Sequence, residues 1–88
     1  MKSLVIIPTY NEIENIKSII ISVLEKKDNF DVLIVDDSSP DGTSKVVEDI
    51  KKDYENRLHL MIRKGKNGLG TAYIDGFNWA IMHHYDYI

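Results

Sequence analysis

Two polar segments carry carboxylate and hydroxyl side chains suited to ligand binding, and each follows a short apolar run. Pro-Thr-Tyr-Asn-Glu at 8–12 follows the run 4–7, and Asp-Asp-Ser-Ser-Pro-Asp-Gly-Thr at 36–43 follows the run 32–35. Short continuous apolar runs are typical of parallel strands that are buried on both faces. Because open parallel sheets bind ligands outside the carboxyl ends of their strands, we expect both segments to lie at one crevice.

Both segments also contain signals for the start of a helix. Thr9 and Glu12 have the spacing of a capping box, in which both side chains bond to backbone N–H groups at a helix N-terminus. Such an N-terminus also attracts anionic ligands, so the same spacing fits a binding role. Ser39 is predicted as an N-cap with Pro40 at the first helical position, although a turn at 41–42 would delay that helix. For residues 38–43 we favour a structural role.

The elements that would position these segments follow from apolar spacing. Apolar runs predict strands at 4–7, 32–35 and 58–62, and residues 85–88 are expected to begin a fourth. The helices between them are predicted from three stripes: Ile13, Ile16, Ile19, Ile20, Val23 and Leu24; Val46, Val47, Ile50 and Tyr54; Leu69, Ala72, Tyr73, Gly76, Phe77, Ala80 and Ile81. The first helix is expected to end at 26–29 and the second near 55–56. This order predicts an α/β fold with a parallel sheet and right-handed crossovers.

Together with Gly-Leu-Gly-Thr-Ala-Tyr-Ile-Asp-Gly at 68–76, the two segments resemble the beginning of inverting family 2 glycosyltransferases of the GT-A fold. Pro-Thr-Tyr-Asn-Glu is common to many of these enzymes. Ser-Pro-Asp-Gly-Thr at 39–43 and Gly-Leu-Gly-Thr-Ala-Tyr at 68–73 make the chain most similar to dolichyl-phosphate or polyprenyl-phosphate mannosyltransferases. The resemblance implies a Rossmann-like three-layer α/β/α fold with a mostly parallel sheet, of which residues 1–88 would form the N-terminal nucleotide-binding portion.

The resemblance also implies a reaction and a binding site. The reaction is transfer of a sugar, mannose from GDP-mannose in the nearest subgroup, to a polyprenyl or dolichyl phosphate with inversion. The resemblance assigns nucleotide contacts to Pro8, Tyr10, Glu12, Asp37 and the backbone around Val35. A carboxylate at position 37 can accept two hydrogen bonds from the N1–H and N2–H₂ edge of guanine.

Metal and phosphate contacts are expected mainly outside this chain. The family holds Mg²⁺ or Mn²⁺ with an Asp-x-Asp motif, and the metal neutralises the departing diphosphate. That motif is expected just after Ile88, so we expect residues 1–88 to be incomplete at the C-terminus, to lack metal ligands and catalytic residues, and to be inactive alone. Arg63 and Lys66 are weaker candidates for a phosphate contact. The three histidines have no partner at metal-ligand spacing and are assigned no metal.

Two alternatives stay open at this point. The first is a non-catalytic module that binds a nucleotide or Mg²⁺, because strand-end Asp pairs hold Mg²⁺ in receiver domains. A receiver would need its acidic pair after the first strand and a phosphorylatable Asp after the third, where this chain has Ile62 and Arg63. The second alternative is a family 2 enzyme that uses a UDP-sugar. The residues that follow Ile88 would distinguish catalysis from binding.

Composition narrows the class of protein. The chain has 88 residues, 43% hydrophobic and 28% charged, which is typical of one small globular domain. Its net charge of −3 argues against nucleic-acid binding, which requires a basic surface. The apolar run 4–7 is too short for a signal peptide or a membrane span. We therefore expect a cytoplasmic protein, with any membrane contact peripheral and on the cytoplasmic face.

Overall fold

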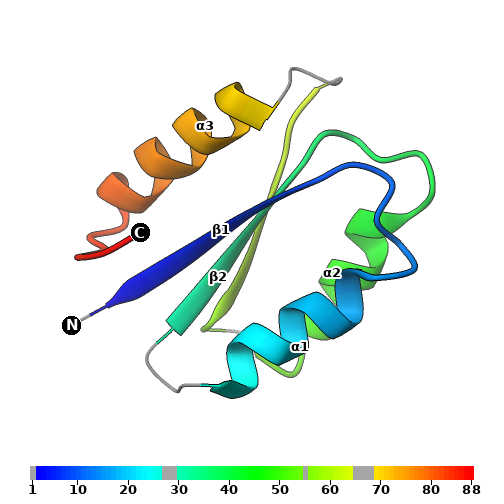
Figure 1. The fold of residues 1–88 in the computed structure, drawn as a ribbon, viewed down its shortest axis with the longest axis horizontal. Coiled ribbons are helices and arrows are strands. Elements are labelled where there is room, and N and C mark those ends of the chain that lie inside the picture. Colours follow the sequence, from blue (N-terminus) through cyan, green and yellow to red (C-terminus); the bar gives the residue numbers. More distant parts are fainter. Residues whose placement is uncertain (1, 27–29, 55, 65–68) are drawn as a thin grey trace.

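The computed structural model describes residues 2–26, 30–54, 56–64 and 69–88, which form a parallel sheet between two layers of helices (Figure 1). The strands pair in the order β1-β2-β3, so β2 is central. The elements are β1 (Ser3–Thr9), α1 (Ile16–Lys26), β2 (Phe30–Asp36), α2 (Thr43–Lys51), β3 (Leu58–Ile62) and α3 (Leu69–Met82). The predicted Rossmann-like α/β/α arrangement is confirmed.

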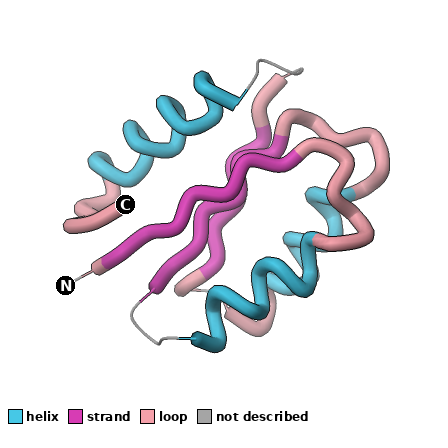
Figure 2. The backbone as a smooth tube through the Cα atoms, viewed as in Figure 1, coloured by secondary structure: helices cyan, strands magenta, loops and turns pink. Residues whose placement is uncertain are grey.

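Helices α1 and α2 cover one face of the sheet (Figure 2). Ile16, Ile20 and Leu24 recur every four residues along α1 and are buried against Val32 and Ile34 of β2. Complete burial of each such side chain stabilises the fold by about 1.5–3 kcal/mol. This stripe therefore determines which face of α1 turns toward the sheet.

The predicted extents of α1 and α2 differ in part from the structure. Ile13 precedes α1, and Ile19 lies on an exposed flank of the helix, so the buried stripe is narrower than predicted. Helix α1 extends to Lys26, whereas 27–29 lie outside the described residues. Helix α2 ends at Lys51, before the predicted end near 55–56, and a series of turns follows it.

Helix α3 covers the opposite face through its smallest residues. Ala72, Gly76 and Ala80 are buried and lie four residues apart, on one side of the helix. A Cβ atom at Gly76 would lie 2.8 Å from two atoms of the Ile6 side chain, so the helix axis approaches β1 at a distance that only glycine permits. The sheet-facing side of α3 is therefore set by small residues.

Bulky members of the predicted α3 stripe lie at its flank instead. Tyr73 and Phe77 are more than 40% exposed, although each directly follows a buried residue of the helix, Ala72 or Gly76. With Leu4, Ile6 and Ile88 they line an apolar groove of about 360 Å³ beside β1. The prediction of a helix here is confirmed, and its large residues Tyr73 and Phe77 lie outside the buried side of the helix.

The end of the chain begins to pair with β1. Tyr87 forms a single parallel bridge to Ser3, and the N–H of Leu4 donates to the carbonyl oxygen of Tyr87 at 2.8 Å. The fourth strand expected at 85–88 is thus present only as this one bridge. Within the described ranges, none of the helices has the length and apolar character needed to cross a bilayer.

Candidate functional site

The two polar segments meet at the carboxyl end of the sheet, as predicted. Thr9 at the end of β1 pairs with Asp36 at the end of β2, and the two loops then run together toward α1 and α2 (Figure 1). Three consecutive backbone N–H groups of the first loop donate to side chains of the second. The donors are Asn11, Glu12 and Ile13, and the acceptors are Ser39 Oγ, Thr43 Oγ1 and Asp41 Oδ2, at 2.9, 3.1 and 3.1 Å.

The carboxylate of Asp36 connects the two loops through hydrogen bonds. Its side chain is fully buried and its carboxylate accepts from Thr9 Oγ1 at 2.6 Å, from the N–H of Ser39 at 2.9 Å and from Ser39 Oγ at 2.6 Å. Asp36 thus caps the turn that follows β2. The carboxylate thereby fixes the ends of β1 and β2 relative to each other.

The predicted capping box at Thr9 and Glu12 is wrong. Thr9 is the last residue of β1, and α1 begins only at Ile16. The hydroxyl of Thr9 donates across the sheet to Asp36, and the carbonyl oxygen of Glu12 accepts from the N–H of Ile16 at 2.8 Å. A buried carboxylate binds the hydroxyl more strongly than a neutral, exposed backbone N–H would.

The predicted N-cap at Ser39 is also wrong, and the alternative turn at 41–42 is confirmed. Helix α2 begins at Thr43, after Gly42 in the left-handed region at φ 93°. The N–H and hydroxyl of Thr43 both donate to Asp41 Oδ1. Residues with a side chain rarely adopt this φ, so Gly42 permits the reversal that delays the helix.

Asp37 lies beside Asp36 but has a different environment. Both of its carboxylate oxygens accept from Arg63, with Nε to Oδ1 at 2.6 Å and Nη2 to Oδ2 at 2.8 Å. Nη1 of Arg63 donates to Thr71 Oγ1 and Asp75 Oδ2, both at 3.0 Å. Asp37 and Arg63 are 7% and 8% exposed, so this is a buried ion pair. The hydrogen bonds to Asp37 raise the pKa of Arg63 above its ordinary value.

The ion pair changes the role expected of Arg63. The sequence offered Arg63 as a phosphate contact, whereas at least four of its hydrogen bonds go to Asp37, Thr71 and Asp75. Lys66, the other candidate, lies outside the described residues. Thr71 and Asp75 were not predicted. Their spacing of four on α3, which places them on one helix face shortly after Arg63, was the available signal.

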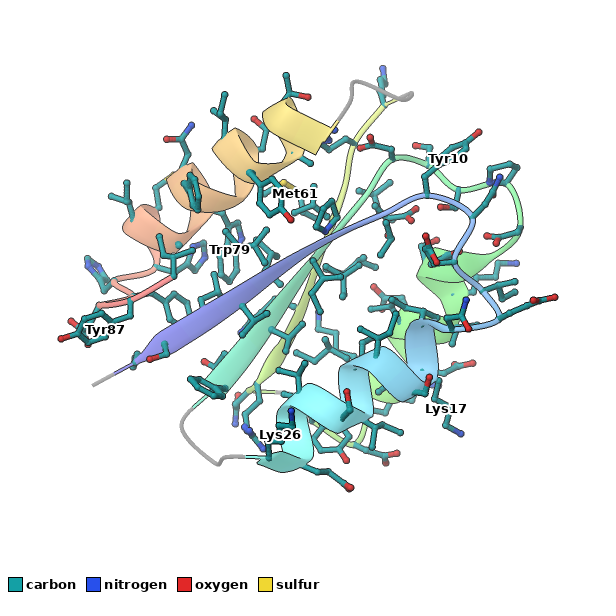
Figure 3. The ribbon with its side chains drawn as sticks, in the orientation of Figure 1. Tyr10, Lys17, Lys26, Met61, Trp79 and Tyr87 are labelled. Carbon is teal, nitrogen blue, oxygen red and sulfur yellow. The ribbon has the colours of Figure 1, made fainter. Side chains whose placement is uncertain are left out.

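The remaining site candidates lie at or near the carboxyl ends of β1 and β2. Tyr10 lies on the loop after β1 with its side chain 38% exposed, and Figure 3 shows it at the carboxyl end of the sheet. Pro8 pairs with Val35, whose side chain is completely buried between the sheet and α3. Val35 can therefore offer a ligand only its backbone. Glu12 lies two residues beyond Tyr10.

A separate aromatic cluster lies on the α3 side, away from these loops. The rings of His59 and His83 both lie beside the ring of Trp79, with centroid distances of 5.0 and 3.9 Å. The hydroxyl of Tyr85 donates to Asp31 at 2.6 Å. Burial lowers the pKa of His59, and burial together with Asp31 raises the pKa of Tyr85. His59 lies on β3, and His83 directly follows α3.

The carboxylates at the sheet edge do not form a metal site in the part of the chain that the structure describes. No three His, Cys, Asp or Glu residues gather there with a geometry suited to a metal ion. Asp36 accepts three hydrogen bonds from Thr9 and Ser39, and Asp37 is paired with Arg63. The expectation that metal ligands lie outside this chain stays a prediction.

Comparison with known proteins finds two similar bacterial enzymes. It is 43% identical over 84 residues to polyprenol monophosphomannose synthase of Mycolicibacterium smegmatis, covering 96% of this chain and 32% of that protein. It is 43% identical over 86 residues to undecaprenyl-phosphate mannosyltransferase of Micrococcus luteus, covering 98% of this chain and 35% of that protein. The chain therefore spans about a third of the length of these relatives.

A solved structure is also similar to this chain. A mannosyltransferase from Pyrobaculum calidifontis, in complex with GDP-Man and Mn²⁺, superposes with a TM-score of 0.73 at 27% identity. The superposition covers 94% of this chain and 24% of that one. The sequence pattern of glycosyl transferase family 2 matches residues 4–82, which is most of the chain. The two loops at the carboxyl end of the sheet carry motifs that resemble this family, and they lie within the matched residues. The chain belongs to glycosyl transferase family 2.

Proposed function

We propose that this chain is the nucleotide-sugar-binding part of an inverting glycosyltransferase that transfers mannose from GDP-mannose to a polyprenyl phosphate. The observation that carries the proposal is the joined pair of strand-end loops, at the sheet edge where α/β folds bind nucleotides. The names of the two bacterial relatives support the lipid-phosphate acceptor, and the ligand of the Pyrobaculum enzyme supports the donor. Residues 1–88 then form one portion of the domain, and the other portion supplies the catalytic groups.

Three features of the described residues suit a nucleoside diphosphate. The exposed ring of Tyr10 offers an apolar face to the base or ribose. Asp37 offers a carboxylate to a base N–H, and the backbones of Pro8 and Val35 pair with each other one residue before the ends of β1 and β2. Glu12 lies on the loop between β1 and α1, and we assign it to the same nucleotide site. Binding the donor in a fixed position is the part of catalysis that this chain would contribute.

The leaving diphosphate needs positive charge that these residues do not supply. The carboxylate of Asp36 accepts from Thr9, the guanidinium of Arg63 donates to Asp37, and no metal cluster gathers in the described ranges. We therefore place the ligands for Mg²⁺ or Mn²⁺ in the remainder of the whole protein. The acceptor phosphate is largely ionised near neutral pH, so it needs little help from a general base. Because that acceptor is a lipid, we place the enzyme peripherally at the cytoplasmic face of a membrane.

Replacing Tyr10 with alanine is expected to weaken GDP binding by on the order of 10-fold or more, because aromatic stacking on a base contributes about 1–3 kcal/mol. Isothermal titration calorimetry of GDP with the protein measures this loss. Tyr87→Ala is a matched control, since Tyr87 is another exposed tyrosine, 57% exposed, at the opposite end of β1 (Figure 3). The proposal is wrong if the unmodified protein does not bind GDP, or if Tyr10→Ala binds it as tightly as Tyr87→Ala.

A further inference from the structure

The loop after β1 presents three consecutive backbone N–H groups to the loop after β2. The N–H groups of residues 11–13 donate to Ser39 Oγ, Thr43 Oγ1 and Asp41 Oδ2, at 2.9, 3.1 and 3.1 Å. The first of them belongs to Asn11, whose φ of 55° lies in the left-handed region. Successive N–H groups that converge in a turn commonly bind an anion. Here the chain's own second loop supplies the acceptors, so the first loop offers a ligand its side chains and not these N–H groups.

Asp41 is the charged acceptor among these side chains. Its Oδ1 accepts from the N–H of Thr43 at 3.0 Å and from the hydroxyl of Thr43, while its Oδ2 accepts from the N–H of Ile13. Burial alone would raise the pKa of Asp41, but the hydrogen bonds from Thr43 and Ile13 outweigh it and lower that pKa below its ordinary value. The carboxyl group is therefore ionised near neutral pH, and an ionised carboxylate can only accept hydrogen bonds.

The hydroxyl of Thr43 has a single proton, and Asp41 determines where that proton points. Because the carboxylate can only accept, the proton lies toward Asp41, and a lone pair of the hydroxyl oxygen accepts from the N–H of Glu12 at 3.1 Å. Thr43 is completely buried, so bulk water cannot replace either partner. The main chain at Glu12 is thereby fixed by a residue 31 positions away, at the start of α2.

We propose that Asp41 and Thr43 are positioning residues for the nucleotide, which hold the loop that carries Tyr10 and Glu12 in its binding conformation before the nucleotide arrives. The inference rests on the proposed function, and it connects the structural role expected for residues 38–43 to binding. A loop that is already ordered loses less conformational freedom when a ligand binds, so more of its contact energy appears as affinity. Asp41 and Thr43 act in this way through the main chain of the first loop, without touching the nucleotide.

Thr43→Val tests the inference, because valine has the shape of threonine without the hydroxyl. Titration calorimetry is expected to show GDP binding weakened by about threefold to tenfold, the cost of ordering the freed loop on binding. Thr43→Ser, which keeps the hydroxyl, should bind GDP nearly as tightly as the unmodified protein. Val47→Ala is the matched control, since it removes buried methyl groups from the same helix and should lower stability without changing GDP affinity.

The outcomes of this titration separate the inference from the proposed function. GDP affinity that is unchanged in Thr43→Val, or equally weakened in Val47→Ala, would overturn the inference while leaving the proposed function intact. Failure of the unmodified protein to bind GDP would overturn both.

Asp41→Asn tests the same network from its other end and decides the inference even if Thr43→Val fails to fold. One carboxylate oxygen becomes an NH₂ donor, which then faces an N–H donor of Ile13 or Thr43, so a loss of GDP affinity similar to that of Thr43→Val is expected. Combining Asp41→Asn with Tyr10→Ala gives a readout that a merely structural role would not change. The loss should shrink once Tyr10 is alanine, because Asp41 acts through the loop that carries Tyr10. Losses that add in full would contradict the positioning role.

Discussion

Replacing Arg63 with methionine is expected to lower the free energy of unfolding by about 3–5 kcal/mol, as removal of one partner of a buried ion pair typically does. Asp37, with its side chain 9% exposed, would keep a buried charge without its guanidinium partner. Thr71 and Asp75 on α3 would also lose the group that ties them to the sheet edge. Urea denaturation of the protein and the variant measures the difference.

The pH dependence and a second variant separate this cause from a simple packing loss. Burial without a counter-charge raises the pKa of a carboxyl group, so folded Arg63→Met would bind a proton more readily than its unfolded state. The deficit in stability should therefore shrink as the pH falls through the carboxyl range. Adding Asp37→Asn to Arg63→Met should recover much of the loss at neutral pH. A deficit that is the same at every pH and in the double variant would contradict the charge explanation.

Asp36→Ala is expected to lower the free energy of unfolding by about 1–3 kcal/mol for each buried donor that it leaves without an acceptor. Its carboxylate accepts from the buried hydroxyl of Thr9 and from two donors of Ser39. Nucleotide affinity should fall as well, because the loops after β1 and β2 would lose the group that aligns them. Denaturation and GDP titration of the same variant measure the two effects.

Asp49→Ala provides the matched control for that substitution. Asp49 is an aspartate of α2 that pairs with Lys52 at 3.6 Å, and both side chains are 78% exposed. Exposed pairs of this kind contribute about 0–1 kcal/mol. Equal losses from Asp36→Ala and Asp49→Ala would show that the buried carboxylate does not hold the two loops together.

The sheet and its helices could be predicted from sequence because their causes are local and periodic. The apolar run 32–35 became the centre of β2, and the spacing of Ile16, Ile20 and Leu24 became the buried side of α1. The meeting of the two polar segments followed from topology, since parallel strands end at the same edge. These inferences needed no knowledge of individual side-chain contacts.

The contacts within the site could not be predicted in the same way, because their partners are far apart in the chain. Thr9 and Asp36 are 27 positions apart, and Asp37 and Arg63 are 26 apart. Capping rules consider neighbours within about four residues, so they predicted that Thr9 bonds at a helix N-terminus and not to a buried carboxylate. Arg63 was predicted as a phosphate contact for the same reason, because its partner Asp37 is not a neighbour in the sequence. The contacts of both Thr9 and Arg63 are therefore set by residues far away in the chain.

The packing of α3 shows a further limit of periodicity. The pattern of apolar residues predicted the helix, but it placed Tyr73 and Phe77 with Ala72 in one apolar stripe, of which only Ala72 is buried. Which of them faces the sheet depends on how closely the helix approaches, and that distance is set by the contact between Gly76 and Ile6. A hydrophobic pattern contains no information on such a distance.

Backbone amide chemical shifts, followed by NMR during titration with GDP, test most directly whether the joined strand-end loops bind the nucleotide. We expect the largest changes at Tyr10, Glu12 and Asp37, with His59 and Tyr85 in the aromatic cluster unchanged. Changes centred on His59 and Tyr85, or no saturable change at the carboxyl ends of β1 and β2, would contradict the assignment of the nucleotide site to these loops.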